Sequence, residues 1–194
     1  MNANEYVERL GVFCHCTINN TVSDNKVKIR IDSEISYQYD FTENKMTEYE
    51  RGEISNVIKY KNDKMGLLNF GLMIYYSLKE EIDYNADIDF DSIITLEELN
   101  DTIKKHFDSK LFRIGEVVDK KWCLIKKDDN YEIVFLNEDK LKIIESDKDR
   151  SFVFNRFYNE LTYATSFLNT LNKYEETFDE KFTEGEILCA LKLT

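Results

Sequence analysis

The alternation of apolar and polar residues is clearest in the second half of the chain. Trp122–Lys126 (WCLIK) and Tyr131–Phe135 (YEIVF) alternate with a period of two, and the polar residues between them are typical of a tight turn. A second turn at 137–139 precedes the apolar segment LKII at 141–144, and a polar run leads to SFVF at 151–154. These segments predict an antiparallel meander of strands.

After this meander the apolar residues follow a helical period. They recur at spacings of 4, 3, 4 and 3, which describe one stripe on a helix: Phe157, Leu161, Ala164, Leu168 and Leu171. The stripe must cover the apolar face of the sheet, because neither element can bury that surface alone. We therefore expect buried side chains at Trp122, Leu124, Tyr131, Ile133, Phe135, Leu161, Ala164 and Leu168.

The first half of the chain repeats this order of elements. VKIRI at 27–31 stands where Trp122–Lys126 stands, and Tyr37–Phe41 alternates as Tyr131–Phe135 does. The segments 46–50 and 57–60 take the places of the next two strands, so that 57–60 corresponds to 152–154. Two units of the same kind are therefore predicted, and whether they arose by duplication stays open.

Helices are predicted around these strands. Asn62 or Asp63 is expected to cap a helix whose apolar stripe is Leu67, Phe70, Ile74 and Leu78. Shorter helices are predicted at 5–10 and at 96–107, and the second begins at Thr95 with the spacing of a capping box.

The predicted fold class is therefore α+β, with two similar antiparallel strand-meander-plus-helix units packed into one compact protein. Residues 1–82 form the first unit, 83–97 an acidic connector, and 98–194 the second unit.

Composition and charge narrow the kind of partner. Hydrophobic residues make up 42% of the chain, so it should fold, and its net charge of −12 repels nucleic-acid phosphate. Such a charge favours a basic protein partner, although it also serves solubility.

The residues after Met1 do not resemble a signal peptide, and the apolar stretch 65–78 is too short to span a bilayer. We expect a cytoplasmic protein with no membrane partner and with reduced cysteines.

Candidate chemistry is sparse along the chain. Cys14, His15 and Cys16 fall in the apolar segment GVFCHCTI, which is predicted as a strand and would point His15 away from both thiols. His106 is the only other histidine, so the ligands of a zinc site are missing. The chain has neither a Gly-x-Ser-x-Gly motif nor a glycine-rich phosphate loop. No enzymatic activity, cofactor or metal is expected.

The segment DIDFDSIITLEE at 87–98 carries the sharpest local pattern. It has acidic residues at positions 1, 3, 5 and 12, as calcium loops of the EF-hand type do. Ser92 stands at position 6, where such a loop needs glycine for its sharp turn. The alternative is a capped helix start after an acidic connector, and calcium binding stays an alternative to the function favoured below.

This segment lies in the part of the chain where acidic residues most outnumber basic ones. From 80 to 101 there are nine acidic residues and no lysine or arginine. Aromatic side chains among acids are what a hot spot for a basic partner would need, although a solvated face is the commoner meaning. The predicted partner-binding residues are Tyr84, Asp87, Asp89, Phe90, Asp91, Glu97 and Glu98.

A resemblance to a known group rests on several short motifs. WCLIKKDDNYEIVF, the following FVF, and the helix with Glu160 and Ala164 resemble immunity proteins of bacterial polymorphic and contact-dependent toxin systems. The turn YERG at 49–52 is similar to a Glu-Arg-Gly turn in such proteins. The resemblance implies a small, acidic, non-enzymatic cytoplasmic protein that binds and neutralises one cognate toxin domain. An acidic phage protein that mimics nucleic acid is a further alternative.

Overall fold

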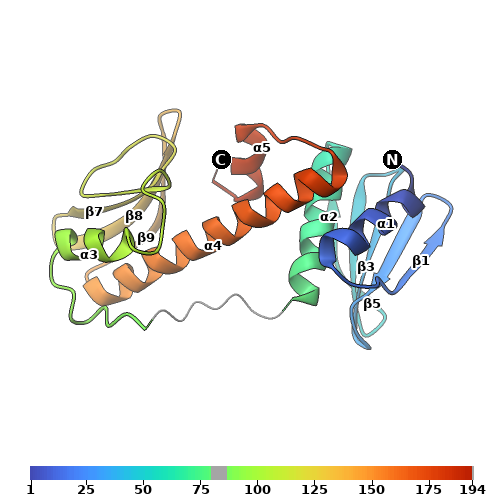
Figure 1. The fold of residues 1–194 in the computed structure, drawn as a ribbon, viewed down its shortest axis with the longest axis horizontal. Helices are drawn as coiled ribbons and strands as arrows, with labels where there is room; N and C mark the ends of the chain where they lie inside the picture. Colours follow the sequence, from blue (N-terminus) through green and yellow to red (C-terminus); the bar gives the residue numbers. More distant parts are fainter. Residues whose placement is uncertain (80–86, 194) are drawn as a thin grey trace. The chain divides into compact units, whose positions relative to one another are not determined.

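The chain has an α+β fold with two separate sheets, as predicted (Figure 1). A computed structural model describes residues 1–79 and 87–193. Within these residues the contacts define two compact units, the first made of 1–79 and 170–190 and the second of 87–169 and 191–193. Each unit is described by itself below.

The first unit contains a five-stranded antiparallel meander in which every strand pairs with its neighbours in sequence. Its turns are short. Arg51 and Gly52 join the last two strands with φ of 53° and 85°, the left-handed conformation of a two-residue hairpin turn, which glycine adopts without a steric cost. The five strands are β1 (Asn20–Ser23), β2 (Lys26–Arg30), β3 (Ile35–Asp40), β4 (Lys45–Glu50) and β5 (Glu53–Lys59).

Two helices bury the apolar residues of this sheet. Helix α1 (Ala3–Cys14) contacts β1 and β2, and helix α2 (Asp63–Leu78) contacts β3 and β4. The rings of Tyr39 in β3 and Phe70 in α2 lie with their centroids 5.4 Å apart in the core. Asn62 caps α2, since its side chain accepts a hydrogen bond from the N–H of Lys64 at 2.8 Å. The predicted helix and its cap are confirmed.

The strand predicted at 11–18 is wrong, because α1 continues through Cys14. Tyr6, Leu10 and Phe13 recur at helical spacing and are all buried. The side chain of Asn2 accepts the N–H of Glu5 and caps the start of this helix, while His15 ends it with a left-handed φ of 54°. The apolar residues of this segment therefore follow the period of a helix and not that of a strand.

The second unit contains a four-stranded sheet that is mixed rather than fully antiparallel. Its last three strands form the predicted meander, but the first strand runs parallel to the second. The strands, in sheet order, are β6 (Phe112–Ile114), β7 (Trp122–Lys127), β8 (Asn130–Asn137) and β9 (Lys140–Asp147). Helix α3 (Leu96–Ile103) precedes them and begins with the predicted capping box between Thr95 and Glu98.

The strand predicted at 151–154 is also wrong, because these residues open helix α4 (Arg150–Phe178). The carboxylate of Asp149 accepts hydrogen bonds from the N–H of Phe152 and the hydroxyl of Ser151, both at 3.1 Å, and so caps the helix. The correspondence between 57–60 and 152–154 therefore fails, since the first segment is a strand and the second a helix.

Six of the eight side chains predicted to be buried in the second unit are buried. They are Trp122, Leu124, Ile133, Phe135, Leu161 and Ala164. Tyr131 and Leu168 are half-buried. Tyr131 is near the start of β8, where its ring meets Phe154 edge-on at 5.3 Å and the ammonium of Lys126 lies 5.5 Å from its centre.

The end of α4 packs in the first unit, whereas the prediction placed all of 98–194 in the second unit. Tyr174 and Phe178 stack with centroids 4.1 Å apart, and both meet the ring of Phe13. Arg9 donates a hydrogen bond to the carbonyl oxygen of Phe178 at 2.9 Å. Gly71 permits this packing, because a Cβ atom there would lie only 2.7 Å from the ring of Tyr174.

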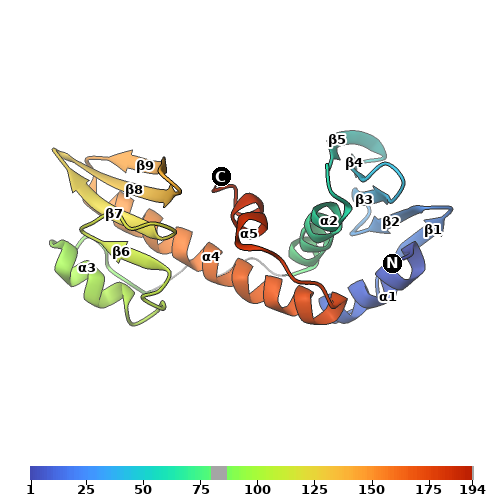
Figure 2. The same cartoon turned by 90° about the horizontal axis from the view of Figure 1, so that it is seen from above.

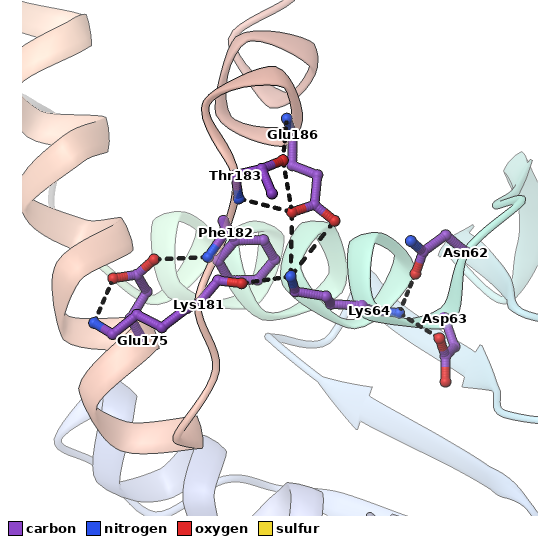
Figure 3. A network of polar contacts seen from close by, with 8 residues as sticks. All are labelled: Asn62, Asp63, Lys64, Glu175, Lys181, Phe182, Thr183 and Glu186. Carbon is purple, nitrogen blue, oxygen red and sulfur yellow. Dashed lines mark hydrogen bonds and ion pairs between the residues drawn. The ribbon is translucent and has the colours of Figure 1, made fainter.

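Helix α5 (Glu184–Ala190) and the segment before it are tied to α2 by Lys64, as Figure 3 shows. The ammonium of Lys64 lies 3.1 Å from the carboxylate of Glu186 and 4.5 Å from the centre of the Phe182 ring. It also donates a hydrogen bond to the carbonyl oxygen of Lys181. One lysine therefore holds the segment 181–186 against α2 through three separate contacts.

Candidate functional site

The acidic segment before α3 is an amphipathic loop held on the second unit. Phe90 and Ile93 are buried, and the Phe90 ring lies 5.9 Å from that of Tyr158 in α4. The backbone N–H groups of Ser92 and Ile93 donate hydrogen bonds to the carbonyl oxygens of Asp89 and Phe90, which makes the loop turn on itself. The apolar side chains therefore fix the loop, and its carboxylates point into solvent.

We call the exposed carboxylates of this loop and of the first turn of α3 the acidic surface: Asp87, Asp89, Asp91, Glu97 and Glu98. Within the described ranges, no lysine or arginine forms an ion pair with any of the five. Elsewhere in the chain, acids such as Glu186 and Asp40 have a basic partner. The charge of the acidic surface is thus left for water or for another molecule.

Glu98 combines this exposure with a structural task. Its carboxylate accepts hydrogen bonds from the N–H groups of Ile94 at 2.8 Å and Thr95 at 3.0 Å. These bonds, that from Thr95 above all, lower the pKa of the Glu98 carboxyl. The group therefore stays ionised at the start of α3, where the helix dipole also favours a negative charge.

One basic residue reaches the acidic surface from another element. The guanidinium of Arg150, at the start of α4, donates a hydrogen bond to the backbone carbonyl oxygen of Asp91 at 3.0 Å. Its charge also contributes to lowering the pKa of Glu98. The acidic surface therefore lies next to one arginine from another element, although none of its carboxylates forms an ion pair with that arginine.

A hollow of about 350 Å³ opens beside the acidic surface, between the loop and the first turns of α4. Phe152 is 49% exposed at its rim, and Ile94, which follows the loop in the sequence, is 65% exposed. Apolar side chains next to unpaired carboxylates can hold the stem of an arginine or lysine whose charged end meets an acid. The residues around the hollow are Ile88, Asp89, Phe90, Asp91, Ser151, Phe152 and Asn155.

The structure changes the predicted set of aromatic anchors. Phe90 is only 8% exposed and belongs to the core, so it is not an anchor that a partner can reach without rearrangement. Tyr84 lies outside the described residues. Phe152 is an exposed aromatic residue, although the sequence pattern placed it inside a strand. Asp149, a capping residue three positions earlier, could have shown that Phe152 lies in the first turn of a helix.

The residues that resemble a calcium loop do not converge on one point. Glu98 at position 12 turns back to cap α3, and Asp89 accepts the N–H of Asp91 at 3.2 Å. In the part of the chain that the structure describes, no three histidine, cysteine, aspartate or glutamate side chains gather as metal ligands would. Their arrangement is that of a capped helix start after an acidic turn.

Two of the four cysteines, Cys14 and Cys123, show no sign of activation as nucleophiles. Burial raises the pKa of the Cys14 thiol to about 12, and Cys123, which is fully buried in β7, also has a raised pKa because of its burial. Both thiols are therefore protonated at neutral pH, whereas a nucleophilic cysteine needs a lowered pKa. Cys123 serves the fold instead, since its sulfur accepts the N–H of Val118 at 3.3 Å.

Comparisons with known proteins add no further assignment. No protein-family model, curated protein or solved structure matches this chain. None of the helices in the described ranges has the length and apolar character needed to cross a lipid bilayer.

Proposed function

We propose that the protein is a non-enzymatic immunity protein that binds and neutralises a cognate bacterial toxin domain with a basic active cleft, in the cytoplasm. The observation that carries the proposal is the acidic surface, a set of carboxylates without basic partners in the described part of a chain of net charge −12. Toxins that cut nucleic acid need a basic cleft for their polyanionic substrate. An acidic protein surface can compete for the same cleft.

The fold supplies what such an inhibitor requires. The acidic surface is mounted on buried Phe90 and Ile93 and on a capped helix, so binding needs little ordering of the loop. The hollow beside it offers the exposed ring of Phe152 to an apolar or arginine side chain of the toxin. Charge would then set the rate of encounter, and the hollow would set the lifetime of the complex.

The test is co-expression with a candidate toxin gene taken from the neighbourhood of the gene for this protein, scored by cell survival, followed by binding kinetics at two salt concentrations. The test variant neutralises the acidic surface by D87N, D89N, D91N, E97Q and E98Q, and the amide oxygen introduced by E98Q can still accept the capping hydrogen bonds. The matched control removes five charges from exposed positions of the first unit by E8Q, D24N, E50Q, E53Q and E176Q.

The neutralised variant should associate more slowly, with a flatter dependence on salt, while the control keeps most of the rate. F152A should instead speed dissociation, with a loss of about 2 kcal/mol in binding free energy if Phe152 is a hot spot. Failure of the wild-type protein to protect cells would refute immunity. Equal protection and equal kinetics for the neutralised variant would place the binding surface elsewhere.

A further inference from the structure

The last strand of the second unit, β9, has an open edge. It is the outermost strand of its sheet and pairs only with β8 in the described structure (Figure 2). None of its eight residues is buried, and Leu141 and Ile143 are 51% and 53% exposed. An edge strand presents a row of unpaired N–H and C=O groups, to which another strand can add.

Proteins commonly protect such an edge with charged side chains, proline or a β-bulge. Charges of one sign also repel a second copy of the same strand. Proline is absent from this chain, and the charges of β9 are divided by sign. Lys140 and Lys142 lie in its first half, and Glu145 and Asp147 in its second half. A parallel second copy would therefore set like charges opposite each other, whereas an antiparallel copy can set each lysine opposite an acid.

The register of the sheet shows that these four charges share one face. Lys142 is opposite Phe135 of β8, and Glu145 is opposite Ile133, two residues away on the same face. Lys140 and Asp147 are opposite Asn137 and Tyr131, which continue that face. The two lysines and the two acids share this face because β9 has a bulge. Opposite Ile133 and Val134 of β8, the bulge inserts Ile144 into β9 as an extra residue. Without this extra residue, the lysines and the acids would lie on opposite faces.

From this charge order and this open edge, we infer that β9 pairs with β9 of a second copy of the chain, antiparallel and about a two-fold axis between Ile143 and Ile144. In this register Lys142 is opposite Glu145 of the second copy, and Lys140 is opposite Asp147 of the second copy. Leu141 then meets Ser146, and the two isoleucines meet at the axis. Each opposite-charge pair occurs twice, which joins the two sheets into one continuous sheet.

The size of the contact sets the expected affinity. Eight paired residues bury less surface than a standard interface, so the dimer should be reversible and of micromolar affinity. Lys142 also donates a hydrogen bond to the carbonyl oxygen of Lys192, which leaves two of its N–H groups for an acid of the second copy.

The experiment is sedimentation velocity over a concentration series, with the full chain and no toxin present, so it is independent of the proposed function. The wild-type protein should shift from monomer to dimer. K142E and E145K each replace two attractive pairs with two repulsive ones, and each should raise the dissociation constant about tenfold or more.

The two variants also test each other. An equimolar mixture of K142E and E145K should form a heterodimer at a concentration where each alone is monomeric. In the heterodimer both pairs between positions 142 and 145 again join an acid to a base, whereas each homodimer has two like-charge pairs there. The double variant K142E/E145K should dimerise as the wild type does. K127E and E53K, exposed charge changes away from this edge, should leave dimerisation unchanged.

Circular dichroism of each variant checks that it is folded. A wild-type protein that stays monomeric well above micromolar concentration would overturn the inference. So would a double variant K142E/E145K that associates no better than the single variants, because a dimer formed elsewhere on the molecule has no reason to respond to these two charges together.

Discussion

Removal of the Lys64 ammonium tests how the end of the chain is held in the first unit. In K64M the apolar stem is kept, but the ion pair with Glu186 and the contact with the Phe182 ring are lost. The side chains of Lys64 and Glu186 are 26% and 22% exposed, so their attraction is screened less than that of a surface pair.

The expected loss follows from these contacts. A hydrogen-bonded ion pair at this depth contributes about 1 kcal/mol, and the cation–π contact adds about 0.5–1 kcal/mol. Glu186 keeps the N–H of Thr183 at 2.8 Å as a donor, so its charge is not stranded without a partner. We therefore expect K64M to lower the free energy of unfolding by about 2 kcal/mol, of which about 1 kcal/mol is coupling to Glu186.

The assay is urea unfolding followed by far-UV circular dichroism for the wild type, K64M, E186Q and the double variant. Hydrogen exchange of the backbone N–H groups of Phe182 and Thr183, which donate to Glu175 and Glu186, reports the local effect. K61M is the matched control, since Lys61 is exposed and three residues away. If K64M unfolds as K61M does and exchange at 182 and 183 is unchanged, the anchoring described for Lys64 is wrong.

Three further predictions concern the core, acid and calcium. L161D places a charge at a fully buried position and should cost several kcal/mol in urea unfolding, and an unchanged midpoint would contradict the helix–sheet core. Burial of Asp40 opposes its ionisation, but the N–H groups of Glu43 and Thr42 and the ammonium of Lys26 outweigh it, so its pKa is lowered on folding. Its contribution is therefore present above about pH 4 and lost as pH falls further, and D40N should flatten that acid loss in unfolding experiments at stepped pH. Calorimetric titration should detect no calcium binding, because Glu98 is occupied as a cap, and micromolar binding abolished by E98Q would show otherwise.

Local patterns predicted most of the strands and helices. The hairpins of the second unit follow from alternation and from turn residues such as Glu138 and Asp139, which adopt positive φ of 46° and 69°. Thr95 and Glu98 predicted a helix start because both partners of the capping box lie within four residues. These features depend only on neighbours in sequence, so one sequence is enough to find them.

The errors arose where short apolar segments fit two periods or where distant segments decide the outcome. Four apolar and small residues at 151–154 fit a strand as well as a helix, and only the cap at Asp149 separates them. Phe90 was assigned to the surface because its neighbours are acidic, whereas the loop turns that one ring toward Tyr158. The aromatic cluster of Phe13 and Tyr174 joins segments with no shared local pattern.

The contact between Arg9 and the carbonyl oxygen of Phe178 joins residues separated by 169 positions, which has a consequence for the order of folding. During synthesis the N-terminal sheet emerges first, but the rings that complete its core come with the last turns of α4. Until then the surface around Tyr6 and Phe13 stays exposed to chaperones and to other nascent chains. Helix α1 should therefore reach its native state late although it is made before the second unit, and pulse-labelled hydrogen exchange should find α1 protected later than β7 and β8.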